Sequence, residues 1–215
     1  MSETGDTDLD AIARELLHTM QTPKRRVRPR IAGAFRDAEE QEIETPAGPV
    51  MTWRLGKGPA TLLVHGWEDD NCLWGAMADK CLSLGRSVVA MDLPGHGFSK
   101  AELTSPDAAA QAVRAVADAC GPMDSLVAHS FGCIASMQAM SAGLDIPRAV
   151  FIASPIPRMS DRWKRASEKG VPDDVIARAQ EIHAAEQIGA PPSFDPLAAA
   201  EEMKTKALFV HSLDD

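Results

Sequence analysis

Five short, almost continuous apolar runs are spaced along the chain, at residues 61–65, 87–91, 125–129, 148–153 and 207–211. The segments between the first four runs predict helices, over 72–84, 106–119 and 131–142. Strands that are apolar along their whole length and separated by helices are typical of a parallel sheet that is covered on both faces. The pattern therefore predicts an α/β fold built around such a sheet.

The segments before the first run have a different character. Residues 8–20 predict an amphipathic helix with one apolar face, made by Leu9, Ile12, Leu16 and Leu17. A basic stretch bounded by prolines follows at 23–30, and two interpretations stay open: a contact for an acidic partner or a solvated connector. Residues 42–55 predict a β-hairpin. We therefore expect an N-terminal helix and basic linker over 1–41 and a main domain over 42–215.

About fifty residues separate the fourth run from the fifth. Helical stretches are expected within this segment, near 160–169 and 172–188. A connection of this length is uncommon inside a compact domain and often serves as a lid. We therefore predict a helical lid insertion over about 155–205.

Composition and charge exclude several classes of protein. The formal net charge is −9, whereas a broad nucleic-acid surface needs a basic stripe, so we expect no nucleic-acid partner. The longest apolar runs have six or seven residues, far below the ~20 needed to span a bilayer. Residues 1–10 are acidic and polar, unlike a signal peptide. We expect a cytoplasmic protein without membrane contact. The cysteines, Cys72, Cys81, Cys120 and Cys133, are scattered and predict free thiols rather than a metal site.

Ser130 stands where the third apolar run gives way to the predicted helix at 131–142. A serine on a sharp strand-to-helix turn is held strained, with its hydroxyl exposed above the sheet. Such a turn needs small residues two positions before and after it, as Ala128 and Gly132 are. The helix N-terminus directs free N–H groups to the same place, which makes the Phe131 N–H a candidate oxyanion donor. The alternative is that Ser130 only caps the helix.

A second loop, His65-Gly66-Trp67, follows the first apolar run. Its glycine lets the loop bend closely, and the Trp67 N–H is the candidate for a second oxyanion donor. His65 is expected to be structural and hydrogen-bonded inside the loop. Three acidic residues at 68–70 then place negative charge on this rim. If they face the mouth of the site, anionic substrates should be disfavoured.

These motifs resemble the α/β-hydrolase superfamily, in its esterase, lipase and cofactor-free haloperoxidase branch. The similarity lies in the order and spacing of residues 65–67, 92–99 and 128–132, and it covers roughly residues 42–215. It implies a mostly parallel sheet with helices on both faces and a helical lid, and no metal or organic cofactor. Asp92 and His96 are then parts of a structural turn. Ala128 replaces the glycine that many members carry.

The resemblance also implies a triad acid. In the family it usually lies four positions after the histidine that ends the relevant strand, which selects Asp215, with Asp214 as the fallback and His211 as a structural residue. The triad order in this fold is serine, acid, histidine, yet all six histidines precede Asp215. We therefore expect that the sequence stops before the catalytic histidine and before the last strand and helix of the fold. Residues 207–211 would then be an exposed edge, and the turnover of the chain as given would be negligible.

Two classes of function remain open at this point. The first is a serine hydrolase that cleaves a carboxylic ester or related acyl bond of a small molecule, with Ser130 as nucleophile, Phe131 and Trp67 as oxyanion donors and Asp215 orienting a histidine. Apolar residues of the insertion, Trp163, Ile176 and Ile182, indicate a small or medium acyl group. The second is a non-catalytic ligand- or partner-binding protein on the same fold. Acyl transfer to an acceptor other than water is a further alternative.

Overall fold

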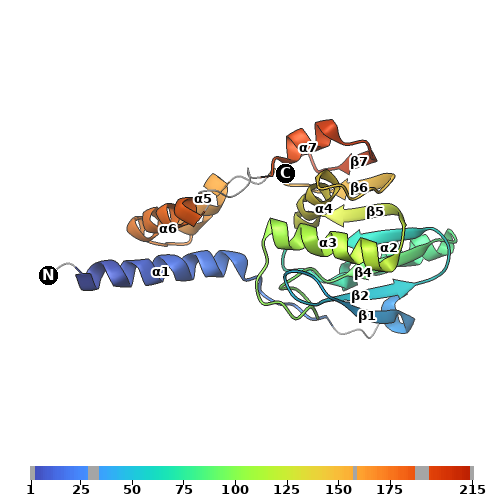
Figure 1. The fold of residues 1–215 in the computed structure, drawn as a ribbon, viewed down its shortest axis with the longest axis horizontal. Coiled ribbons are helices and arrows are strands. Elements are labelled where there is room, and N and C mark those ends of the chain that lie inside the picture. The colour runs from blue at the N-terminus through green and yellow to red at the C-terminus, as the bar shows by residue number, and fades with distance from the viewer. Residues whose placement is uncertain (1–2, 29–33, 157–158, 187–193, 214–215) are drawn as a thin grey trace. The chain divides into compact units, whose positions relative to one another are not determined.

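The contacts within the chain divide it into two compact units (Figure 1). The computed structural model describes residues 3–28, 34–156, 159–186 and 194–213. Residues 23–155 and 195–215 belong to one unit, here called the sheet unit. Residues 1–22 and 156–194 belong to the other, here called the helical unit. The predicted N-terminal helix and most of the predicted lid insertion therefore lie in the same unit.

Seven strands form one sheet in the described part of the sheet unit, in the order β1-β2-β4-β3-β5-β6-β7. They are β1 (Glu39–Ile43), β2 (Val50–Leu55), β3 (Ala60–Val64), β4 (Ser87–Met91), β5 (Met123–His129), β6 (Arg148–Ile152) and β7 (Lys206–Val210). The hairpin β1–β2 and the pair β2–β4 are antiparallel, and the pairs from β4 to β7 are parallel. The predicted hairpin and the five predicted strands are confirmed.

Helices cover both faces of this sheet. They are η1 (Ala34–Asp37), η2 (Asn71–Trp74), α2 (Gly75–Ser83), α3 (Pro106–Cys120), α4 (Phe131–Ser141) and α7 (Pro196–Glu202). On one face, Leu63 packs in a core with Phe35 of η1 and Ala78 of α2. On the other face, α4 approaches the side chain of Val64, the next residue along β3. The predicted α/β fold with helices on both faces is confirmed, and α7 is a helix that the sequence pattern did not predict.

The helical unit consists of α1 (Glu3–Gln21), α5 (Met159–Glu168) and α6 (Asp173–Glu186). Its core joins Ala13 and Leu17 of α1 to Ala179 and Ile182 of α6, with Trp163 of α5 packed against them. Ile182 and Trp163 therefore stabilise the unit itself, and their apolar character is not evidence for a substrate pocket.

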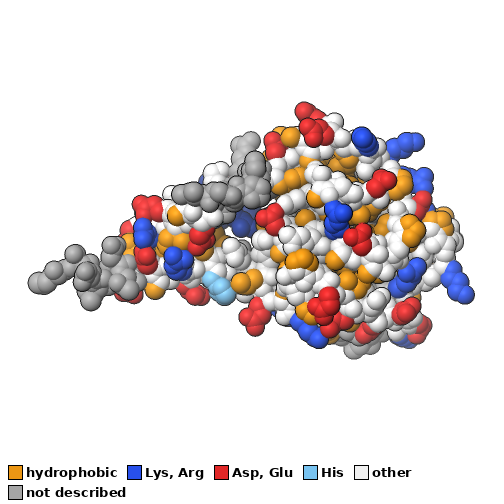
Figure 2. Space-filling view, in the orientation of Figure 1, with side chains coloured by type: hydrophobic (Ala, Val, Ile, Leu, Met, Phe, Trp, Pro, Cys, Tyr) orange, Lys and Arg blue, Asp and Glu red, His pale blue; other side chains and the backbone are white. Residues whose placement is uncertain are grey.

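The sheet ends at β7, which pairs with β6 only among the described strands. All five of its residues are exposed, including Leu208, Phe209 and Val210. The expected exposed edge at 207–211 is thus present. On the face of the sheet unit shown in Figure 2, acidic and basic side chains are interspersed. Within the described ranges, no helix has both the length and the apolarity that crossing a bilayer requires.

Candidate active site

Ser130 lies at the carboxyl end of β5, where the chain turns directly into α4. Its backbone has a φ of 49°, a conformation that costs a non-glycine residue about 1–3 kcal/mol. Two main-chain bonds hold it there, because its N–H donates to Ile152 O at 2.9 Å and its carbonyl accepts the Cys133 N–H at 2.9 Å. The half-buried side chain makes no capping hydrogen bond to α4. This geometry removes helix capping as an explanation for the serine.

Two close approaches explain why the neighbours of Ser130 are small. A Cβ atom added to Gly132 would lie 2.6 Å from Val64 O and even closer to His65 O. A Cβ added to Gly66 would lie 3.1 Å from the Cβ of Ser130. The two glycines therefore allow the end of β3, the start of α4 and the serine to meet at one point of the sheet's carboxyl edge.

The loop after β3, residues 65–71, is here called the oxyanion loop because it carries the candidate donor Trp67. The Trp67 ring meets the Phe131 ring edge-on, with centroids 5.4 Å apart. The structure thus brings the side chains of the two residues whose N–H groups were predicted as oxyanion donors beside each other. Phe131 follows Ser130 in the chain, and Gly66, the residue before Trp67, approaches the Cβ of Ser130. The N-terminus of α4 adds a partial positive charge that favours a developing oxyanion.

His65 holds this loop through hydrogen bonds of both its ring nitrogens. Its Nε2 accepts the Leu93 N–H at 2.9 Å, which places the proton on Nδ1, and Nδ1 donates to Gly66 O at 2.7 Å. The ring is fully buried, and this burial lowers the pKa of His65 to about 3. A neutral ring with both nitrogens engaged has a structural role, as the sequence predicted.

Asp92 joins the oxyanion loop to the loop after β4, residues 92–101, here called the β4 loop. Its buried carboxylate accepts the Asn71 N–H at 2.8 Å and the Phe98 N–H at 2.7 Å. His96 of the same loop is buried, its Nδ1 is 2.8 Å from Pro94 O, and burial lowers the pKa of this histidine. Both residues thus belong to a structural turn, as the resemblance implied.

The acidic rim is not a free negative surface. Arg28 contacts Asp69 at 2.7 Å and Asp70 at 3.5 Å, and Glu68 lies 3.8 Å from Arg26. The Asp70 side chain is only 1% exposed. The basic segment 23–28 therefore binds acidic residues of the chain itself, a pairing that neither interpretation of the basic stretch had included. The expectation that this rim disfavours anionic substrates loses its basis, because its charges are paired.

Asp214 and Asp215, the two candidate acids, lie outside the described residues. The six histidines are all described, and none is placed as a base by its contacts. His129 has a buried Nδ1 that makes no hydrogen bond in the described chain. His183 lies in the helical unit against Trp163, with ring centroids 6.2 Å apart. His211 is exposed, beyond the end of β7.

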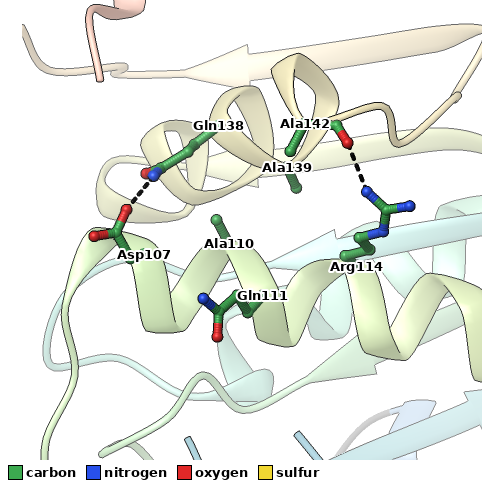
Figure 3. A pocket seen from close by; sticks show the side chains of 7 residues that line it. All are labelled: Asp107, Ala110, Gln111, Arg114, Gln138, Ala139 and Ala142. Carbon is green, nitrogen blue, oxygen red and sulfur yellow. Dashed lines mark hydrogen bonds between the residues drawn. The ribbon is translucent and has the colours of Figure 1, made fainter. Parts of the chain in front are cut away.

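A hollow of about 160 Å³ lies between α3 and α4, and no residue of the loops around Ser130 lines it (Figure 3). Its lining consists of Asp107, Ala110, Gln111, Arg114, Gln138, Ala139 and Ala142. The polar groups bind each other across it, since Arg114 donates to Ala142 O at 2.6 Å and the Gln138 amide donates to Asp107. These bonds fasten the two helices together.

The four cysteines are free, and burial raises the pKa of Cys133, close to the nucleophile in sequence, to about 12. The described residues contain no group of three or more His, Cys, Asp or Glu side chains that could hold a metal ion.

Known proteins share parts of this chain. A pimeloyl-[acyl-carrier protein] methyl ester esterase of Xanthomonas campestris pv. campestris is 31% identical over 119 residues, which are 54% of this chain and 46% of that protein. A protein of the same name from Nitrosospira multiformis is 41% identical over 49 residues, 23% of this chain and 18% of that protein. The chain therefore spans less than half the length of these curated relatives.

Solved structures and a family match address the fold directly. An esterase of Pyrococcus furiosus superposes with a TM-score of 0.63 at 17% identity, covering 87% of this chain and 76% of that chain. At this identity the likeness shows the fold alone. Residues 61–213 match the family described as the alpha/beta hydrolase family. Together with the order of the strands, this match shows that the chain belongs to the alpha/beta hydrolase family.

Proposed function

We propose that the chain carries the nucleophile and oxyanion site of a serine hydrolase, which cleaves a carboxylic ester or related acyl bond of a small molecule. One observation carries the proposal: Ser130 is held at a φ of 49° and its side chain does not cap α4. Strain of this kind persists where surrounding structure enforces it, and it clusters at functional sites. The names of the curated relatives, methyl ester esterases, support an ester as the substrate.

The proposed reaction has two halves. The Ser130 hydroxyl attacks the acyl carbon while a base takes its proton, and the carbonyl oxygen becomes an oxyanion that the Phe131 and Trp67 N–H groups bind. The intermediate then expels the alcohol, which receives the proton, and an acyl-enzyme remains. Water, deprotonated by the same base, releases the acid and restores the serine. Removing one oxyanion donor typically costs about 10²–10³-fold in turnover.

We place the base after Asp215 in the complete protein, with Asp215, or Asp214 in its place, orienting it. This assignment follows the serine, acid, histidine order of the fold. It is supported by the contacts of His65, whose two ring nitrogens are both engaged in hydrogen bonds, and by the place of His129 next to Ser130, because consecutive side chains leave the backbone in different directions. We also propose that the helical insertion acts as a lid. A non-catalytic binding protein is less well supported, because binding alone gives no reason to hold Ser130 strained.

Labelling of the 215-residue chain by a fluorophosphonate tests the nucleophile. Free imidazole is added to stand in for the histidine, and mass spectrometry locates the modified residue. We expect phosphonylation of Ser130 that increases with imidazole concentration and is absent in Ser130→Ala. Ser136→Ala, which removes a buried hydroxyl from the same helix, should label like the unmodified chain.

Two results would contradict the proposal. If no imidazole concentration gives label at Ser130 in a folded chain, Ser130 is not the nucleophile. If the 215-residue chain hydrolyses p-nitrophenyl esters rapidly without imidazole, and Ser130→Ala abolishes this, the base does not lie after Asp215.

A further inference from the structure

The basic segment 23–28 crosses two loops of the sheet unit at once. On the β4 loop, the Arg25 guanidinium donates to the carbonyls of Ser99 at 2.5 Å, Ala101 at 2.6 Å and Gly97 at 3.3 Å. Pro23 is buried and lies so close to Gly95 that a Cβ added there would be 2.9 Å from its Cγ. One end of the segment is thus fastened to main-chain groups of the β4 loop.

The other end of the segment is fastened to the oxyanion loop. The Arg28 N–H donates to Asp70 at 3.0 Å, and its guanidinium lies 2.7 Å from Asp69. Asp70 in turn accepts the Cys72 N–H at 3.0 Å and so begins η2. The Lys24 N–H donates to Glu68 at 3.2 Å. Every acidic residue from 68 to 70 therefore accepts a bond or ion pair from this segment.

The backbone beside the candidate donor needs such support. Glu68, the residue after Trp67, has a φ of 55°, which is unfavourable for any residue other than glycine. From inside the molecule this loop is held by Asp92 through the Asn71 N–H. From outside it is held by segment 23–28. The residues directly after Trp67 are therefore held by contacts that come from distant parts of the sequence.

We propose that residues 23–28 are a strap that holds the oxyanion loop in its working geometry, with Arg28 as a positioning residue for the Trp67 N–H. The inference rests on the proposed function in so far as that N–H binds the oxyanion. The strap lies before residues 61–213, which match the family. Because its ion pairs are partly exposed, they should weaken with salt.

Hydrogen exchange of the 215-residue chain tests the strap without any reaction. In Arg28→Ala we expect amides of residues 66–72 to exchange roughly fivefold faster, the effect of losing a favourable partly exposed ion pair. Arg26→Ala is the matched control. It removes the same charge from the same segment, but its side chain is 61% exposed and its contact with Glu68 is 3.8 Å long. Its exchange should match that of the unmodified chain.

A second variant distinguishes loss of the Arg28–Asp69 ion pair from a general loss of folding. Asp69→Asn removes the negative charge that pairs with Arg28 but keeps Oδ1, the oxygen that lies 2.7 Å from Arg28 and accepts the Asp70 N–H at 3.0 Å. It should accelerate exchange as Arg28→Ala does, and the double variant should be no faster than either single variant. High salt should accelerate exchange of residues 66–72 in the unmodified chain and not in Arg28→Ala.

The rate of imidazole-dependent labelling at Ser130 links the strap to catalysis. We expect Arg28→Ala to lower this rate roughly fivefold and Arg26→Ala to leave it unchanged, with equal melting temperatures. If the unmodified chain labels and both variants match it in exchange and labelling, the strap is refuted and the proposed function stands. If Ser130 labels in none of them, the proposed function fails, and the catalytic role of the strap fails with it.

Discussion

Acidification is expected to destabilise the sheet unit through His65, in the pH range where histidines titrate. The ring is fully buried, and its two nitrogens bind Leu93 N–H and Gly66 O. Burial lowers the pKa of His65 to about 3, whereas an unfolded chain has a histidine pKa of about 6.5. Between pH 6.5 and about pH 3, His65 therefore takes up a proton in the unfolded chain but stays neutral in the folded chain.

The sign and size of the effect follow from this difference. Below pH 6.5 the unfolded state binds more protons than the folded state, so stability falls as the pH falls. The contribution of neutral His65 to the free energy of unfolding is complete above pH 6.5. It is lost progressively as the pH falls to about 3, the pKa of His65 in the folded state. The loss is about 1.4 kcal/mol per pH unit, or about 2 kcal/mol between pH 7 and pH 5. His96, whose pKa is also lowered by burial, acts in the same direction.

Urea unfolding at a series of pH values, followed by tryptophan fluorescence, measures this loss. Trp163→Phe serves as the background, because Trp163 lies in the helical unit and the other tryptophans lie in the sheet unit. His65→Gln removes the titrating group, so its free energy of unfolding should fall about 2 kcal/mol less between pH 7 and pH 5. His211→Gln, at an exposed position, should keep the full loss. Equal losses in His65→Gln and the background would refute the reasoning.

Two further predictions concern packing. Gly132→Ala should destabilise the sheet unit by about 1–3 kcal/mol in urea unfolding, because its Cβ would lie 2.6 Å from a carbonyl of β3. Gly75→Ala, where a Cβ meets no atom within 4 Å, should be neutral or slightly stabilising. Ala179→Leu overfills the core between α1 and α6 and should speed hydrogen exchange over residues 8–20. Ala185→Leu, on an exposed position of the same helix, should leave that exchange unchanged, and identical exchange in both variants would contradict the helix pairing.

The features that the sequence predicted well are those set by short-range sterics. The apolar run at 87–91 became β4 with the same bounds, because a strand buried on both faces needs apolar residues throughout. Ser130 could be located because the turn needs a small residue at 132, and the structure shows the carbonyls of Val64 and His65, at the end of β3, against that position. Such requirements act within a few residues and leave a visible pattern.

Features set by distant parts of the chain left no comparable pattern. The apolar face of α1 predicted a helix, but many surfaces could have covered it, and nothing local indicated α6 as its partner. Helix α7 is seven residues long, too short for the periodic signal on which such predictions depend. The order of the parallel strands likewise had to come from the structure or from the family resemblance.

The charges at the mouth of the site show why distant pairing also changes the chemistry. Read alone, the acidic residues 68–70 predict repulsion of anions if they face the site, and the basic residues 23–30 predict either an acidic partner or a solvated connector. The structure places basic residues of segment 23–28 against the acidic residues 68–70. The opposite charges compensate each other, so neither group can be interpreted alone. With the strap bound, the rim sets the position of the Trp67 N–H, and its charge is too well matched to sort substrates by sign. Selectivity for charge must therefore be sought in residues other than 68–70.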